Sequence, residues 1–116
     1  MYLEEQERLK ETLKRYKDTT IIVEGNKDKT ALEKLGLHKA ICLRGSVFSF
    51  CEKIALRKKE VAILTDLDKE GRKLYSALRK NLERNGVKID DSLRDIIFSE
   101  TQVSQIEGLA GYLGLT

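Results

Sequence analysis

Short apolar runs alternate along the chain with longer segments in which apolar residues recur at helical spacing. The runs predict three strands, at residues 19–23, which are all β-branched, 40–43 and 61–65. The segments that follow the strands predict helices, at residues 27–35, 47–59 and 71–84. The chain is therefore organised as a succession of strand–helix units.

Strands that alternate with helices in this way indicate a parallel sheet joined by right-handed crossovers. The run at residues 61–65 is apolar at consecutive positions, as expected for a central strand that is buried on both faces. Residues 87–89 add a candidate fourth strand at an edge. The predicted fold class is α/β in three layers, with a mainly parallel sheet of about four strands flanked by helices.

Helical patterns also occupy both ends of the chain. Apolar spacing predicts an N-terminal helix within residues 1–17. Residues 91–116 read as a less regular helical segment, in which Ser104 and Glu107 have the spacing of a capping box. No linker separates these ends from the core at residues 19–90, so we expect one domain over all 116 residues.

The composition bounds the class of protein. Hydrophobic residues make up 41% and charged residues 35% of the chain, and no apolar run approaches the roughly 20 residues of a membrane-spanning helix. The acidic first stretch has no apolar signal core, so we expect a cytoplasmic location. Cys42 and Cys51 lack metal-ligand spacing and are expected to be buried free thiols. A net charge of +3 permits a nucleic-acid partner without requiring one.

Three acidic residues follow the ends of predicted strands, where parallel sheets form their ligand crevices. Asp66 and Asp68 come two residues apart after the third strand, so extended backbone directs both carboxylates to one side. Glu24 follows the first strand and joins them if the first and third strands are neighbours. Carboxylates with few other ligands suit Mg²⁺ or Mn²⁺, so these three residues are the predicted metal ligands.

Each acidic residue also has a purely structural alternative. Asp68 precedes a helix, where aspartate commonly acts as the N-cap. Asp28 lies in the first turn of a helix and either favours the dipole there or supports the metal ligands from behind. The capping box is the structural explanation for Glu107. Three like charges at one edge weaken the structural reading, because they destabilise the fold unless a cation offsets them.

Basic residues near the same edge are candidates for holding a phosphate group or nucleic acid: Lys27, Arg44, Lys69 and Arg72. Arg44 is the best placed, because it lies in a turn beside a glycine where backbone amides can also be free. Solvation at the surface is the alternative for each of the four. His38 is the only histidine and follows a helix end, where we expect a surface position.

Two motifs together resemble a known family. Glu24, Gly25 and Asp28 form an EGxxD motif, and Asp66, Asp68 and Gly71 form a DxDxxG motif about forty residues later. The pair is similar to the Toprim domain of primases, topoisomerases, nucleases, recombination mediators and ribosomal-RNA maturases, and the likeness covers residues 19–86. The P-loop, the dinucleotide fingerprint and a Ser-His-Asp arrangement are absent from the sequence.

The resemblance implies a Rossmann-like Toprim fold and a role for each motif residue. Glu24 is implied as general acid or base, Asp66 and Asp68 as Mg²⁺ ligands, and Gly25 and Gly71 as residues that permit tight turns and close helix approach. The expected activity is Mg²⁺-dependent phosphoryl transfer on RNA or DNA, foremost phosphodiester hydrolysis by a nuclease. The alternatives are a non-catalytic module that binds nucleic acid or protein, primase-like nucleotidyl transfer with a partner, and a small-molecule phosphatase.

Overall fold

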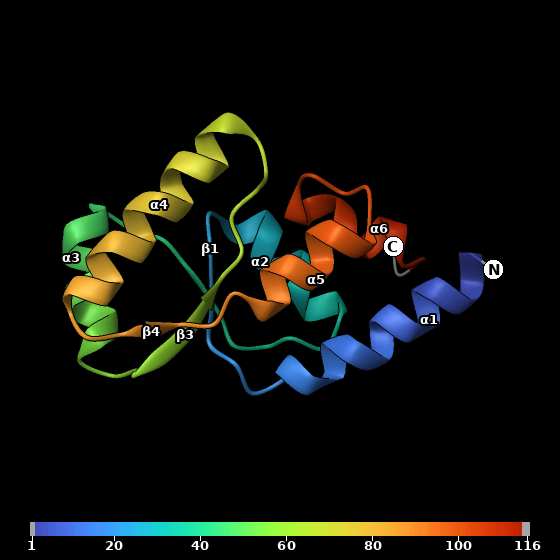
Figure 1. Cartoon of the computed structure of the whole chain (residues 1–116), viewed down its shortest axis with the longest axis horizontal. Helices are drawn as coiled ribbons and strands as arrows, with labels where there is room; N and C mark the ends of the chain where they lie inside the picture. The colour runs from blue at the N-terminus through green and yellow to red at the C-terminus, as the bar shows by residue number, and fades with distance from the viewer. Residues whose placement is uncertain (1, 115–116) are drawn as a thin grey trace.

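The computed structural model describes residues 2–114 and contains a four-stranded sheet with helices on both faces (Figure 1). The strand order is β2-β1-β3-β4 and every neighbouring pair is parallel. The strands are β1 (Ile21–Val23), β2 (Ala40–Cys42), β3 (Glu60–Ile63) and β4 (Lys88–Ile89). The predicted three-layer α/β class is thereby confirmed. Residues 1 and 115–116, which belong to the predicted terminal segments, lie outside the described residues.

A helix occurs at each place where the apolar spacing predicted one. The helices are α1 (Tyr2–Leu13), extended by the 3-10 turn η1 (Lys14–Tyr16), α2 (Asn26–Lys34), α3 (Val47–Ala55), α4 (Lys69–Arg84), α5 (Ser92–Glu100), η2 (Ile106–Gly108) and α6 (Leu109–Tyr112). The end of α3 differs most from the prediction, because its last turn closes when the amides of Arg57 and Lys58 both donate to the carbonyl of Ile54. Arg57 and Lys58 therefore belong to this closing turn and not to the helix, and Lys59 lies beyond it.

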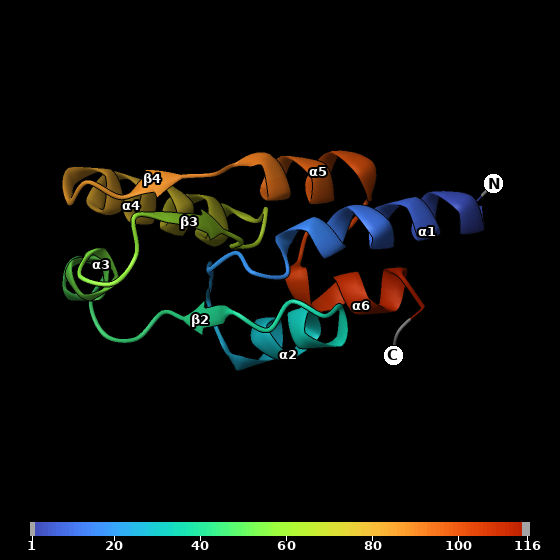
Figure 2. The ribbon, with the colours of Figure 1, turned by 90° about the horizontal axis from the view of Figure 1, so that it is seen from below.

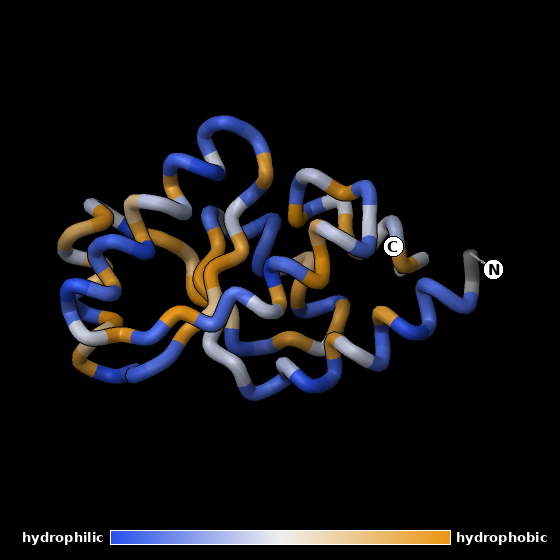
Figure 3. Tube along the Cα trace, in the orientation of Figure 1, coloured by the Kyte–Doolittle hydropathy of each residue, from blue (hydrophilic) through white to orange (hydrophobic). Residues whose placement is uncertain are grey.

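The two faces of the sheet are covered by different sets of helices (Figure 2). On one face, Ile22 and Ile63 pack in an apolar cluster with residues of α3 and α4. On the other face, Ile21, Val23 and Leu64 pack with residues of α1, α2, α5 and α6. Consecutive residues of a strand point to opposite faces, so the continuous apolar runs seen in the sequence serve both layers. In Figure 3 the central strands are mainly hydrophobic, whereas hydrophobic and hydrophilic residues alternate along the helices.

The prediction of two buried free cysteines is confirmed. Cys42 and Cys51 are both free and buried. Burial raises the pKa of the Cys51 thiol. No helix among residues 2–114 combines the length and the apolar character that crossing a membrane requires.

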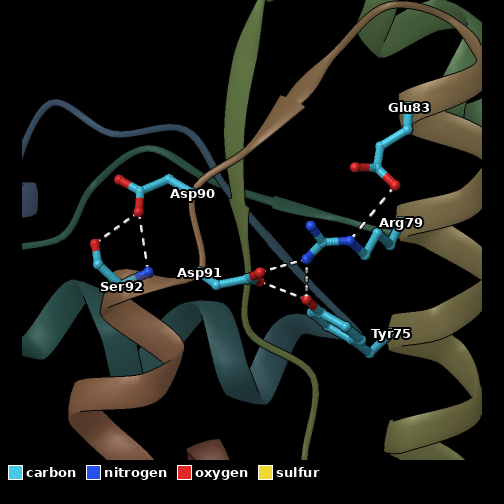
Figure 4. Close-up of polar contacts among 6 residues, drawn as sticks. All are labelled: Tyr75, Arg79, Glu83, Asp90, Asp91 and Ser92. Carbon is cyan, nitrogen blue, oxygen red and sulfur yellow. Dashed lines mark hydrogen bonds and ion pairs between the residues drawn. The ribbon is translucent and has the colours of Figure 1, made fainter.

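A polar network fastens the start of α5 to the side of α4 (Figure 4). Arg79 donates to the hydroxyl of Tyr75 at 2.6 Å and forms an ion pair with Asp91, and the Tyr75 hydroxyl donates to the same carboxylate. Burial alone would raise the pKa of Asp91, but the hydrogen bonds from Tyr75 and Arg79 and the charge of Arg79 outweigh it and lower that pKa. The network therefore stabilises the ionised form of Asp91.

Replacing Asp91 by asparagine is expected to destabilise the protein at neutral pH by about 1 kcal/mol, because the partly exposed ion pair and its hydrogen bond are both weakened. The folded-state pKa of Asp91 lies below its ordinary value of 3.8, so its contribution is complete above that value and is lost as the pH falls through the folded pKa. Urea unfolding of both proteins across pH 2–7 measures the difference, which should shrink at the acid end.

The matched control is Glu83→Gln, which removes the other carboxylate paired with Arg79, at 3.5 Å and with a side chain 52% exposed. This change should alter the free energy of unfolding by less than about 0.5 kcal/mol. A loss as large as that of Asp91→Asn, or a pH-independent difference for Asp91→Asn, would contradict the assigned role of the network.

Candidate metal centre

The parallel pairing of β1 with β3 places Glu24 beside Asp66. Ile22 pairs with Ile63 in the sheet, so the residues that follow these strands emerge together (Figure 1). The backbone amide of Asp66 donates to Oε2 of Glu24 at 3.5 Å. The condition set for Glu24 by the sequence, that the first and third strands be neighbours, is therefore met.

The carboxyl group of Glu24 is held partly out of water and among like charges. Burial raises its pKa, and the charges of Asp66 and Asp28 and a hydrogen bond with the Asp66 carboxyl raise it further, while the bond from the Asp66 amide opposes the shift only in part. A glutamate in this position holds a proton more readily than one in water. A raised pKa of this kind suits a group that accepts and returns a proton.

Asp28 bonds the backbone at the start of α2 and also belongs to the acidic cluster with Glu24 and Asp66. The residue is 9% exposed, and its Oδ2 accepts a hydrogen bond from the amide of Gly25 at 3.2 Å, at the start of α2. Burial raises the pKa of Asp28, and the charges of Asp66 and Glu107 add to the rise although the bond from Gly25 opposes it. Glu107 therefore lies electrostatically close to the site.

The predicted capping box at Ser104 and Glu107 is wrong. The 3-10 turn η2 begins after Gln105, which forms no side-chain capping bond. Instead the amide of Ile106 donates to Oδ1 of Asp66 at 2.8 Å, and the carbonyl of Ser104 accepts from the amide of Leu67 at 2.7 Å. A residue forty positions away thus caps the turn, which local sequence spacing cannot reveal.

Asp68 occupies the structural position that was its alternative. It is the N-cap of α4, and its Oδ1 accepts from the amide of Gly71 at 2.7 Å. A carboxylate has two oxygens and about four acceptor sites, so capping leaves capacity for a metal ligand. The backbone bonds to Glu24 and Asp66 likewise occupy one oxygen of each. The metal-ligand role of the three acids stays a prediction.

The two motif glycines differ in what the fold asks of them. A Cβ atom on Gly71 would lie 2.1 Å from the carbonyl oxygen of Asp66, so only glycine lets α4 approach the loop that carries the acids. Gly25 has extended backbone, with φ −153°, and open space where a Cβ would stand. The implied need for close approach therefore applies to Gly71, whereas at Gly25, the N-cap of α2, the described residues leave room for a Cβ atom.

Arg94 holds the acidic loop in place and was missed by the sequence reasoning. Its guanidinium donates to the carbonyl of Thr65 at 2.6 Å and to the carbonyl of Asp66 at 3.5 Å. It lies over the rings of Tyr75 and Phe98, at 4.6 and 5.1 Å from their centroids, and is only 9% exposed. The available signal was an arginine directly beside a buried leucine in α5, with an aromatic residue four positions later.

None of the four basic residues proposed to bind phosphate is bonded to an acidic residue of the described chain. Lys27, Arg44, Lys69 and Arg72 are all exposed, and their side chains form no hydrogen bond or ion pair with another residue of the described chain. Lys69 and Arg72 lie in the first turn of α4, directly after Asp68. Arg44 instead lines a separate groove at the edge strand β2. His38 is exposed, as expected.

The donor types in this cluster fit a hard divalent cation. Glu24, Asp66 and Asp68 offer only oxygen, which Mg²⁺ and Mn²⁺ prefer, and they leave room for the waters that Mg²⁺ retains. Within residues 2–114, however, no three acidic, histidine or cysteine side chains already converge as a metal-binding group. Glu24 and Asp66 are together, and Asp68 is turned toward its cap.

These features define a class of protein. The signature of the Toprim domain matches residues 18–91, which is more than half of the 116-residue chain, and the chain belongs to the Toprim domain family. Toprim domains are metal-binding modules associated with nucleic acid. The resemblance drawn from the two motifs is therefore confirmed.

Two UPF0292 proteins and one solved structure are similar to most of this chain. The chain is 34% identical over 98 residues to a UPF0292 protein of Methanocaldococcus jannaschii, covering 80% of this chain and 77% of the relative. It is 33% identical over 116 residues to a UPF0292 protein of Thermococcus onnurineus, covering 96% and 87%. A solved structure of a protein from Aquifex aeolicus superposes with a TM-score of 0.76 at 25% identity, covering 87% of this chain and 94% of that one.

Gly71→Ala is expected to lower the free energy of unfolding by about 3 kcal/mol or to prevent folding, because the added methyl group collides with backbone rather than with a movable side chain. Gly25→Ala, in open space, should change it by less than about 0.5 kcal/mol. Guanidinium unfolding of the two variants beside the wild type makes the comparison. If both variants lost the same free energy of unfolding, the close approach of Gly71 to Asp66 would not be the reason for glycine in the DxDxxG motif.

Proposed function

We propose that this protein is a divalent-metal-dependent phosphoryl-transfer enzyme that hydrolyses phosphodiester bonds in nucleic acid. The observation that carries the proposal is the contact between Glu24 and Asp66 at the carboxyl ends of neighbouring parallel strands, where burial and like charge raise the pKa of Glu24. A proton-accepting carboxyl group beside a cation ligand is the arrangement that activates water at a phosphate.

In this proposal the acidic residues divide into two metal ligands and one residue that moves a proton. Asp66 and Asp68 hold the cation, which when bound polarises the phosphodiester and offsets its negative charge. Glu24 takes a proton from the attacking water and returns it as the oxygen–phosphorus bond of the leaving group breaks. Arg94 keeps the backbone of Thr65 and Asp66 in position. Water is the only co-substrate, so the step balances without a further reactant.

A non-catalytic binding module is the second candidate, and two observations favour it. Asp68 is engaged as the cap of α4, and no group of three metal-binding side chains converges within the described part of the chain. A module of this kind binds nucleic acid through its phosphates with a strong dependence on salt and leaves the strand intact.

The deciding experiment is cleavage of end-labelled structured RNA and of single- and double-stranded DNA, with Mg²⁺, Mn²⁺ or EDTA. We expect metal-dependent cleavage that Glu24→Gln lowers about 10²–10⁴-fold, the usual effect of removing a general acid or base. Asp68→Asn should remove metal-dependent cleavage and weaken Mn²⁺ binding in calorimetry while the fold persists, because asparagine caps helices as well as aspartate does.

Glu70→Gln is the matched control, since Glu70 lies in the first turn of the same helix and is exposed. It should cleave like the wild type. If every substrate stays intact although Mn²⁺ and nucleic acid both bind, the protein is a binding module and the proposed hydrolysis is wrong. If Asp68→Asn cleaves at the wild-type rate, the metal assignment is wrong.

A further inference from the structure

A groove of about 510 Å³ lies along the open edge of the sheet, apart from the acidic cluster. It is lined by β2 and by residues at the end of α3, where Ile41, which is partly buried, and Leu56, which is 86% exposed, supply apolar surface. We call this feature the β2 groove. It uses none of the acids assigned to the metal centre.

The strand in this groove pairs on one side only. The amide of Ile21 donates to the carbonyl of Lys39, and the amide of Leu43 donates to the carbonyl of Val23. Because alternate residues of a parallel strand face opposite neighbours, the backbone groups of Ala40 and Cys42 face away from β1. No other strand within residues 2–114 covers this side, since β2 is the end of the sheet (Figure 2). An edge of this kind is a template for an added strand.

Four cations surround the groove: Lys29, Arg44, Lys53 and Arg57. Their side chains form no ion pair or hydrogen bond with any other described residue. By contrast, Arg79 on α4 is paired with both Glu83 and Asp91. The rim therefore carries uncompensated positive charge around an apolar lining, and its complement is an acidic, partly apolar ligand.

We propose that the β2 groove binds an extended acidic segment of a partner protein, which adds a strand to the sheet beside β2. The backbone of the segment pairs with Ala40 and Cys42, its apolar side chains face the apolar lining, and its acidic side chains meet the rim. This site is independent of the proposed hydrolysis, because it uses none of the acidic residues of the metal centre.

Two other occupants fit the groove less well. A second copy of the chain that paired β2 with β2 would bring the two cationic rims together, which like-charge repulsion opposes. Single-stranded nucleic acid would match the charge, but Phe50, the aromatic residue of the groove, is only 7% exposed and offers little surface for a base to stack on. The unpaired backbone edge of β2, together with the apolar lining of the groove, favours a peptide.

The test uses the full chain and a fluorescein-labelled peptide in which Glu or Asp alternates with Val or Ile over seven residues. Fluorescence polarisation should show saturable binding that Lys53→Glu combined with Arg57→Glu weakens about tenfold or more, because two attractive contacts become repulsive. Lys80→Glu combined with Arg84→Glu is the matched control: it has the same spacing on an exposed face of α4 and should change the affinity less than twofold.

A second measurement on the wild type tests the strand geometry itself. Two versions of the peptide carry N-methyl groups at odd or at even positions, so that each blocks one edge of the added strand. One version should lose binding and the other should retain it. Equal binding of both, or equal weakening by the two double variants, would overturn the proposal.

The competing occupants are resolved by the same proteins. A labelled single-stranded oligonucleotide of equal charge is tested in the same assay. If it binds in place of the peptide, and if this binding is lost in the Lys53→Glu, Arg57→Glu variant, the groove is a nucleic-acid site. Sedimentation equilibrium that shows a wild-type dimer abolished in this variant would assign it to a second copy. Either outcome overturns the peptide proposal.

Discussion

The parallel pairing of β1 with β3 at the centre of the sheet is the constraint on which the rest of the structure depends. Parallel strands need crossover helices, and both faces of the sheet must then be covered. The apolar residues of β1 meet this requirement by alternating between the two clusters of the core. The same pairing makes the strands end side by side, so Glu24 and Asp66 meet through the geometry of the sheet.

Asp66 connects this centre to the rest of the chain. Its amide bonds Glu24, its carbonyl lies against Gly71 and accepts from Arg94, and its carboxylate caps the turn at Ile106. One residue therefore links β1, the start of α4, α5 and the C-terminal segment. This explains why acidic groups that repel one another are nevertheless held together: the backbone around them is fixed from several directions, as is common where a fold serves a site rather than its own stability.

The helices and strands were predictable because their signal is local. The apolar runs and spacings of the central strands and of α4 depend on neighbours a few residues away, and each element appears where it was expected. The end of α3 and the capping box at Ser104 were the failures. The first depended on where a turn closes. The second depended on Asp66, whose distance in the sequence hides its contact with Ile106.

The sequence by itself determined the class of fold, the acidic residues at the strand ends and the membership of a family, because periodicity and short motifs are written in neighbouring residues. Only the tertiary structure decided that Glu24 touches Asp66, that Asp68 caps α4 and that Arg94 holds the acidic loop. It also decided that Arg44 belongs to a groove at the sheet edge. The physical reason is that strand order and helix docking bring together residues that no local interaction connects.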